Sequence, residues 1–351
     1  MNFEGKINPN PSSELRAESF KVSNSSSTNP YFETNPVLAE VVRSGYVESI
    51  HRGSVTLYDQ SGNIRTFGHP ERQTYPRSSH KPLQAVAMVR NGLDLPAHLL
   101  ALVGASHEGT EQHVETAKAI LATAGLDETA LDNTMSMPGS AKAAYEWASA
   151  GGRADRIHHN CSGKHSGMVA TCVINNWPTK GYRDPEHPLQ KAILETVEDL
   201  AEEKVGATAI DGCGAPIHAI STSGLALAFR KIRLAAPGTP EAQVADAMSA
   251  YPFLVGGEGR DVTELMTGAP GVFAKDGAEA VYGAAHLDGR AVAFKLDDGA
   301  LRSIGTVLAA VLESWDYHTP EVENWLSYPV LGGGNRVGEI RPSKEFKQWL
   351  K

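Results

Sequence analysis

Cysteine is scarce in this chain, which contains only three among its 351 residues. So few cysteines cannot build the disulfide framework that stabilises many small secreted proteins. The N-terminal residues Met-Asn-Phe-Glu-Gly-Lys also lack the apolar core of a secretory signal peptide. We therefore expect the protein in a reducing compartment, the cytoplasm.

Long apolar runs and an excess of positive charge are absent as well. No run approaches the roughly 20 apolar residues that a membrane-spanning helix needs. The net charge of -9 and the pI near 5.8 argue against nucleic acid or an anionic membrane as a partner. What is present is the composition of a globular protein, 41% hydrophobic and 21% charged, in a chain long enough for a large core.

The organisation of the chain follows from its hydrophobic patterns. Residues 1–35 are rich in Ser, Asn, Pro and Glu and lack apolar periodicity, so we expect a flexible tail there, followed by a single catalytic domain over 36–351. Strand-like runs lie at both ends of that domain, at 37–42, 54–58, 64–67, 271–275, 280–284 and 291–296. Helical patterns occupy 81–92, 113–125, 164–176, 188–204, 241–251 and 300–315. The pattern predicts an α+β fold with an antiparallel sheet from both chain ends and a helix-rich middle.

The most informative stretch is Ser78-Ser79-His80-Lys81, which is followed at once by Pro82 and an apolar helix. Serine is a weak nucleophile and needs a base to take its proton as it attacks. Two residues three apart share one face of a helix, so the Lys81 amine can reach the Ser78 hydroxyl. This is the S-x-x-K arrangement of serine β-lactamases and penicillin-binding proteins. By itself it is a weak signal, because most such tetrapeptides are solvated surface.

A second serine lies in the small-residue loop Gly104-Ala-Ser106-His107-Glu108-Gly109. The loop nearly matches the G-x-S-x-G turn that presents a nucleophile, but Glu108 breaks the pattern. An ordinary helix N-cap before His113 is an equally good interpretation. The pair His107-Glu108 does not begin a zinc-binding H-E-x-x-H motif, because residue 111 is Glu.

Two of the cysteines lie in loops that are dense in reactive side chains. Cys161 precedes Lys164 by three residues, and Cys213 stands between two glycines in Asp211-Gly-Cys-Gly. Two thiolates brought together can hold zinc with two further ligands. Neither cysteine belongs to a C-x-x-C motif, so two small residues packed in loops is the simpler alternative.

Late in the chain, Lys275-Asp276-Gly277 follows a strand-like run where the β-lactamases have K-T-G. Lysine before a hairpin turn is common, so the match alone is weak. Just before it, Glu258-Gly259-Arg260-Asp261 is a polar stretch that either binds a carboxylate or forms a surface turn.

Taken together, these segments resemble the L-asparaginase II family, the L-asparaginases of the Rhizobium etli type. The resemblance covers residues 36 to 345 and is carried by six motifs: Glu48-Ser-Ile-His51, Arg77-Ser-x-x-Lys81-Pro-Leu-Gln, Ser106-His-x-Gly, Asn160-Cys-Ser-Gly-Lys-His-Ser-Gly, Asp211-Gly-Cys-Gly-x-Pro and Lys275-x-Gly-Ala-Glu. The cysteine-containing motifs are the most specific.

The resemblance implies a β-lactamase-like, penicillin-binding-protein-like fold and hydrolysis of L-asparagine to aspartate and ammonia. It implies that Ser78 is the nucleophile with Lys81 as its base, and that Ser106 and Lys275 form a second Ser-Lys pair. It further implies Zn2+ held by Cys161, Lys164 and Cys213 with a water, and a homodimer. The substrate-binding residues that it implies are Arg77, His51, Glu48 and Asp211.

Three alternatives remain open at this point. A β-lactamase or peptidase of the same fold would carry the motifs S-D-N and K-T-G, and both are missing. An amidohydrolase acting on glutamine is compatible with every motif. A non-catalytic, zinc-stabilised binding protein is disfavoured by the intact serines and lysines. The T-G-G-T segment of the threonine-type asparaginases does not occur.

Overall fold

The computed structural model describes residues 34–351. The expected tail therefore lies almost entirely outside the described residues, and that expectation stays a prediction. Asn35 already belongs to the folded unit: it is 3% exposed, and its side chain donates to Asp297 and accepts from Ser54.

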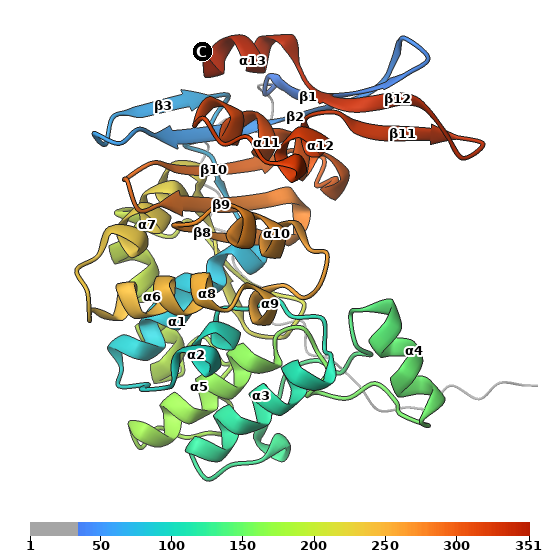
Figure 1. The fold of residues 1–351 in the computed structure, drawn as a ribbon. Coiled ribbons are helices and arrows are strands. Elements are labelled where there is room, and N and C mark those ends of the chain that lie inside the picture. Colours follow the sequence, from blue (N-terminus) through green and yellow to red (C-terminus); the bar gives the residue numbers. More distant parts are fainter. Residues whose placement is uncertain (1–33) are drawn as a thin grey trace, which may run out of the picture. The chain divides into compact units, whose positions relative to one another are not determined.

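An eight-stranded antiparallel sheet forms the frame of the fold, with strand order β11-β12-β1-β2-β10-β9-β8 and β3 paired to β2 (Figure 1). Its strands are β1 Val37–Arg43, β2 Tyr46–Tyr58, β3 Ile64–Phe67, β8 Val272–Gly277, β9 Val281–His286, β10 Ala291–Leu296, β11 Tyr328–Gly332 and β12 Asn335–Pro342. Strands from both ends of the described chain thus lie side by side, as predicted. Two small ladders pair β4 Gln73–Thr74 with β7 Ile220–Ser221, and β5 Thr208–Ile210 with β6 Pro216–His218.

The helices fill the middle of the chain and return near its end. The first group is α1 Lys81–Arg90, α2 Ala97–Val103, α3 Glu111–Thr123, α4 Ala141–Ser149, α5 Ser162–Ile174, α6 Pro188–Ala201, α7 Thr222–Leu234, α8 Pro240–Ala250, α9 Pro252–Val255 and α10 Asp261–Gly268. The second is α11 Ile304–Ser314, α12 Pro320–Leu326 and α13 Lys344–Leu350. Short 3-10 turns are η2 Arg77–His80, η3 Glu128–Ala130, η4 Ala278–Ala280 and η5 Leu301–Ser303. The predicted α+β class is confirmed, and this arrangement is the one that the β-lactamase-like resemblance implies. No helix among residues 34–351 has the length and apolarity to cross a membrane.

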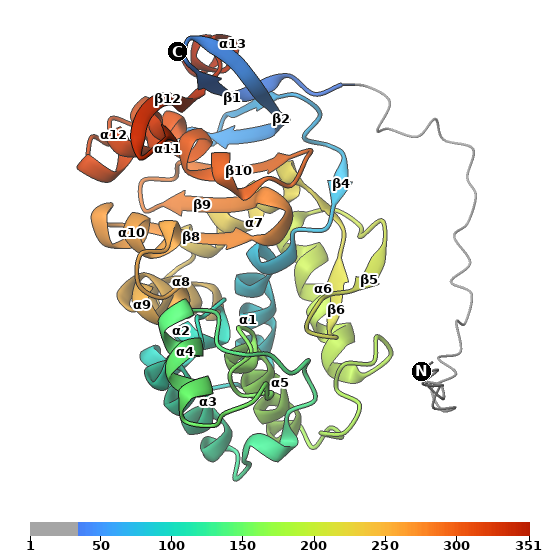
Figure 2. The ribbon, with the colours of Figure 1, turned by 90° about the vertical axis from the view of Figure 1, so that its right-hand side faces the viewer.

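Helices cover both faces of the sheet, as the strand register shows. On one face, Phe229 of α7 stacks on Phe273 with ring centroids 5.1 Å apart and fills the space left by Gly283. On the other face, Tyr282 stacks on Phe294, and Phe67 contacts Phe346 of α13. Figure 2 shows α7 and α11 on opposite sides of β9 and β10. Alternation of side chains along each strand supplies both apolar faces.

Two central helices, α1 and α5, are buried along most of their length. Every residue of α1 from Lys81 to Met88 is buried, and so is every residue of α5 from Ser162 to Cys172. Their apolar residues therefore surround the whole helix rather than one stripe, as in the interior of a large core. Both helices begin at segments that the sequence analysis selected, so their rigid N-termini hold those segments in place.

The strand register at Gly53 leads to a prediction about stability. Gly53 lies where β2 passes from its pairing with β1 to its pairing with β10, opposite Leu296. A Cβ there would overlap the backbone carbonyl of Lys295, which cannot move without breaking the ladder. We expect Gly53→Ala to lower the free energy of unfolding by about 1–3 kcal/mol, measured by urea denaturation.

A matched control for this substitution is Gly139→Ala. An added Cβ at Gly139 would make an ordinary contact 3.6 Å from Glu108, so the free energy of unfolding should change little. Equal stability of the Gly53→Ala protein and the wild type would contradict the steric argument.

Candidate active site

Ser78 lies on the tight turn η2, directly before α1. The preceding residue, Arg77, has a φ of +51°, a left-handed conformation that is strained for a side chain with a Cβ and is typical of functional turns. Ser78 is partly exposed, whereas Ser79 is fully buried and donates from its hydroxyl to the Pro76 carbonyl at 2.6 Å. Of the two neighbouring serines, Ser78 is the one that a substrate can reach.

Gly277, at the end of β8, supports this turn from the other side. A Cβ at this position would lie 2.6 Å from the Pro76 oxygen and 3.0 Å from the Ser79 nitrogen. Only glycine lets the edge strand approach the serine turn so closely. This contact gives the Lys-x-Gly pattern a physical reason, because residue 277 must be small for Lys275 to stand beside the turn.

Lys81 is 1% exposed, and its amine joins three segments of the chain. Nζ donates to the Ala105 carbonyl at 2.6 Å, to Ser106 Oγ at 2.9 Å and to the Asn160 carbonyl at 3.5 Å. A buried amine is stable only when such acceptors surround it. In the described structure, Lys81 thus pairs with Ser106. It does not pair with Ser78, which lies one helical turn before Lys81.

Lys275 is fully buried and takes a different partner from the predicted one. Its Nζ donates to the Asp276 carbonyl at 2.8 Å and to the Asp276 carboxylate. Burial lowers the pKa of Lys275 to about 8; Asp276 opposes this shift, and the nearby positive charge of Lys81 adds to it. The strand that carries Lys275 contacts the η2 turn directly before Lys81, although no hydrogen bond between Lys275 and Ser106 is found among the described residues.

His107, which belongs to the Ser106-His-x-Gly motif and to the failed zinc motif, fixes the second serine loop. Its Nδ1 accepts from the Gly109 N–H at 3.1 Å, so its Nε2 carries the hydrogen and donates to Ser162 Oγ at 3.0 Å. Burial holds the pKa of His107 well below its usual range, which keeps the ring neutral. The residue connects the Ser106 loop to the first residue of α5. Thr110, rather than Ser106, caps the following helix.

The thiols of Cys161 and Cys213 meet beside the amine of Lys164. All three residues are at least 97% buried, and Lys164 Nζ donates to Cys213 Sγ at 3.3 Å. A hydrogen bond with Cys213 is the largest influence on Cys161 and places the pKa of its thiol well below the usual range. Burial lowers the pKa of the Lys164 amine, but the two sulfurs outweigh this effect, and the pKa is raised overall.

His165, the residue after Lys164, was not predicted and borders the same cluster. Its Nδ1 lies 2.7 Å from the Tyr182 hydroxyl, and burial lowers its pKa to about 4 despite a hydrogen bond with Cys213. Its position directly after a predicted metal ligand is the only signal for it in the sequence.

Arg77 and Asp211 form an ion pair at the edge of the cluster. Arg77 Nε donates to Asp211 Oδ1 at 2.8 Å. Burial raises the pKa of Asp211, but Lys164, the Gly212 N–H and Arg77 together outweigh it, and the pKa is lowered. The site therefore presents a fixed positive and a fixed negative group side by side, close to the Ser78 turn.

The structure does not bring the two remaining predicted residues into this cluster. Glu48 lies on the β1–β2 hairpin, 46% exposed, and pairs with Arg43 at 3.1 Å. His51 is buried within the sheet, where Nε2 accepts from Arg302 at 3.1 Å and Nδ1 donates to Asp298 at 2.5 Å. No contact links either residue to Ser78 or Lys81 within residues 34–351, so their expected role in binding substrate stays a prediction.

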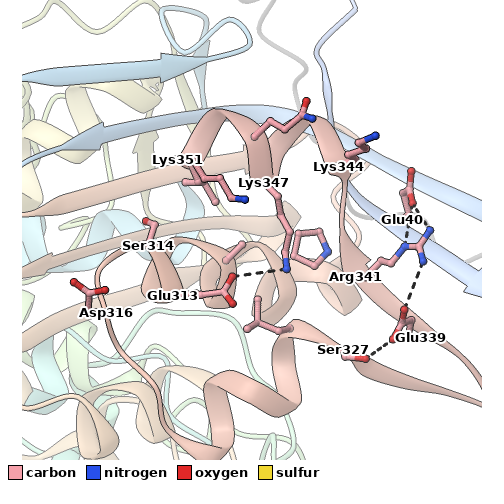
Figure 3. Close-up of a pocket in the computed structure, with 15 residues that line it drawn as sticks. Glu40, Glu313, Ser314, Asp316, Ser327, Glu339, Arg341, Lys344, Lys347 and Lys351 are labelled. Atoms are coloured by element: carbon pink, nitrogen blue, oxygen red, sulfur yellow. Dashed lines mark hydrogen bonds and ion pairs between the residues drawn. The ribbon is translucent and has the colours of Figure 1, made fainter.

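A cavity of about 970 Å³ lies elsewhere, between α11, α12, α13 and β12 (Figure 3). Its wall includes Glu313, Lys347 and Arg341, and the ion pair between Lys347 and Glu313 crosses it at 3.7 Å. None of the residues predicted from the sequence lines this cavity.

Comparisons with known proteins agree with the motifs. The sequence matches the family described as L-asparaginase II over residues 39–342, which is most of the chain. No curated protein sequence matches it.

Among solved structures, the chain is similar to Bacillus subtilis glutaminase YbgJ in covalent complex with 5-oxo-L-norleucine, with a TM-score of 0.36 and 13% identity over 75% of this chain and 88% of the other. A probable Bacillus subtilis glutaminase complexed with 6-diazo-5-oxo-L-norleucine has a TM-score of 0.35 and 13% identity over 79% and 89% of the two chains. The native form of Mglu has a TM-score of 0.35 and 12% identity over 81% and 70%. At this distance, we draw no conclusion about the substrate from these structures.

The match over residues 39–342, together with the Ser-x-x-Lys turn and the cysteine-lysine cluster, shows that this chain belongs to the L-asparaginase II family, a family of amidohydrolases.

Proposed function

We propose that the protein hydrolyses the side-chain amide of L-asparagine to aspartate and ammonia through an acyl-enzyme on Ser78. The observation that carries the proposal is the accessible Ser78 on its strained turn, one helical turn before a lysine that already holds Ser106 at 2.9 Å. A reachable serine beside a buried amine is what nucleophilic attack on an amide requires.

In the first half of the reaction, Lys81 acts as the neutral amine and receives the serine proton while Ser78 Oγ attacks the amide carbon. The Ser106 hydroxyl already binds the Lys81 amine, so it can carry a proton between that amine and the leaving group. The amide C–N bond then breaks, ammonia leaves with that proton, and an aspartyl ester remains on Ser78. In the second half, water attacks the ester carbon and gives a proton to Lys81. The ester C–O bond then breaks, Ser78 Oγ takes that proton back, and aspartate leaves.

The tetrahedral intermediate needs hydrogen-bond donors for its oxyanion. The first N–H groups of a helix lack partners within the helix and point toward its N-terminal end. In the η2 turn, the Ser79 N–H already donates to the Pro76 carbonyl at 3.1 Å. The Ser78 N–H lies where β8 comes closest, and we assign it this role. Donors fixed before the reaction stabilise the developing charge without reorganising.

Arg77 and Asp211 suit the ends of an amino-acid substrate. A free amino acid carries a carboxylate and an ammonium group on one carbon. A guanidinium and a carboxylate held 2.8 Å apart offer one partner to each. Glutamine has the same two groups and one further methylene, which in an apolar pocket changes affinity by only about 1–3 kcal/mol. Glutamine is therefore the second candidate substrate.

We also propose that Cys161, Lys164 and Cys213 hold Zn2+. What supports this is the donor set itself, two adjacent buried thiols and an amine 3.3 Å from one of them. Thiolate sulfur is a preferred zinc ligand. No group of three or more His, Cys, Asp or Glu side chains in the described part of the chain is placed to hold a metal, so the site depends on Lys164 as the third ligand. A bound zinc would act as a Lewis acid that orients a polar group of the substrate.

The doubled serine supplies a matched pair of variants for the nucleophile. We expect Ser78→Ala to reduce ammonia release from L-asparagine by about 10³-fold or more, because the attacking oxygen is gone. Ser79→Ala should keep the activity and lose only about 1 kcal/mol of stability, because Ser79 donates to Pro76. Ammonia release is measured with L-asparagine, L-glutamine and a β-lactam as substrates.

Each outcome of this experiment decides between alternatives. Loss of activity in Ser79→Ala with full activity in Ser78→Ala would move the nucleophile to Ser79. No release by folded, zinc-loaded wild type from any of the substrates would favour the non-catalytic binding protein. Faster release from L-glutamine would make the protein a glutaminase.

The zinc proposal predicts one zinc per chain in protein purified without chelator, measured by elemental mass spectrometry. Cys161→Ser should lose the metal and melt at a lower temperature. The bound zinc would join the start of helix α5 to the β5–β6 turn, and Cys161 is one of its ligands. The control is Cys172→Ser, since Cys172 is buried within α5 away from the cluster. A full complement of zinc in Cys161→Ser would disprove the assigned ligand set.

We further propose that two copies associate through the projecting β1–β2 and β11–β12 strands seen in Figure 1. Large apolar side chains stay exposed there, including Tyr46 at 79%, Leu331 at 58% and Tyr328 at 45%. Exposed apolar residues grouped on one surface are typical of an interface. Light scattering should give the mass of a dimer for the wild type, and Tyr46→Lys with Leu331→Lys should give a monomer. A monomeric wild type would contradict the proposal.

A further inference from the structure

Two buried lysines of the active site, Lys81 and Lys275, have separate hydrogen-bond partners. Within the described chain, Lys275 Nζ donates only to Asp276, and Ser106 Oγ binds only Lys81. The strand of Lys275 nevertheless contacts the turn before Lys81, whose positive charge lowers the pKa of Lys275. A residue of its own strand thus holds Lys275, and no hydrogen bond joins it to Ser78 or Ser106 in the described chain.

Asp276 is itself fixed from the opposite side. Arg260 donates to its second carboxylate oxygen, Oδ2, at 2.7 Å, and both Asp276 and Lys275 are buried. Arg260 comes from the polar segment before α10, for which the sequence left two interpretations open, a carboxylate binder or a surface turn. The carboxylate that it binds in this structure belongs to the protein. Asp276 therefore has one oxygen for each of two cations.

We propose that Asp276 is a positioning residue of the active site: its carboxylate, anchored by Arg260, holds the Lys275 amine away from Ser106 and thereby sets when Lys275 can exchange a proton with the catalytic serines. This inference rests on the proposed function, in which Ser106 carries a proton during amide hydrolysis. The K-T-G motif of the β-lactamases has a neutral threonine at the place of Asp276, so this clamp is a feature of the chain itself.

The charges that face Lys275 determine in which direction each substitution shifts its pKa. Lys81 comes from α1, Arg260 precedes α10, Asp261 begins α10, and Asp276 lies on the same strand. The carboxylate of Asp276 raises the pKa of Lys275, whereas Lys81 and Arg260 lower it. Removing the carboxylate makes Lys275 neutral at a lower pH, and removing Arg260 makes it neutral at a higher pH.

The test is the pH profile of kcat/KM for L-asparagine. One limb of this profile should follow the titration of the Lys275 amine, and this limb should be absent in Lys275→Met. Asp276→Asn should move this limb to lower pH by about one to three units, the usual effect of one close charge. Arg260→Gln should move it to higher pH, and Asp276→Glu, which keeps the carboxylate, should return it toward the wild-type position.

Opposite shifts by the two neutral variants are what a purely structural role would not produce. The control is Asp288→Asn, because Asp288 pairs with Arg290 at the β9–β10 turn of the same sheet and should leave the limb in place. An unmoved limb in both Asp276→Asn and Arg260→Gln, or equal shifts in one direction, would overturn the proposal. If Asp276→Asn does not fold, the direction in which Arg260→Gln moves the limb still tests the proposal.

A crystal structure of Asp276→Asn provides a measurement that does not need activity. We expect Lys275 Nζ to move within hydrogen-bond distance of Ser106 Oγ once the carboxylate is gone. A Lys275 amine that keeps its wild-type position would overturn the clamp. Wild-type protein without amidase activity would refute the proposed function, whereas this structural outcome would still decide the role of Asp276.

Discussion

The buried amine of Lys81 is the interaction on which the rest of the site depends. Removing an ammonium group from water costs several kcal/mol unless acceptors replace the lost hydration. The acceptors here are Ala105, Ser106 and Asn160, which come from the loop after α2 and the segment before α5. Satisfying one side chain therefore fixes the second serine, the start of α5 and the cysteine next to it in one arrangement.

The other charges of the site follow the same rule, each cation having an anionic or polarisable partner. Lys164 faces the two sulfurs, Lys275 faces Asp276, and Arg77 faces Asp211. A buried polar network of this kind is stable only when every member is paired. It also means that a substrate with charged groups enters a place where fixed charges of both signs are already oriented, so little reorganisation is needed.

The sheet and the central helices could be predicted from the sequence because their signals are local. Pro82 marks the start of α1, Gly92 marks its end, and the short apolar run at Ala291–Leu296 indicates strand β10. The final hairpin of β11 and β12 was missed, and so were the helices α2, α4, α7, α9, α10, α12 and α13. The hairpin strands are half-exposed and carry a broken alternation, with a register shift between Val330 and Leu331, so their pattern is too weak to detect without the neighbouring β1.

The sequence by itself determined which residues are chemically special: Ser78 with Lys81, Ser106, the cysteines with Lys164, and Lys275 with Gly277. Only the tertiary structure decided which of them are partners. Spacing along a helix suggested Ser78 for Lys81, yet the amine binds Ser106, and Lys275 binds its own neighbour. Glu48 lies on an exposed hairpin and pairs with Arg43, and its expected role in binding substrate stays a prediction. Such pairings depend on how the edge strand β8 meets the N-terminus of α1, and no local pattern encodes a distance between segments so far apart in the chain.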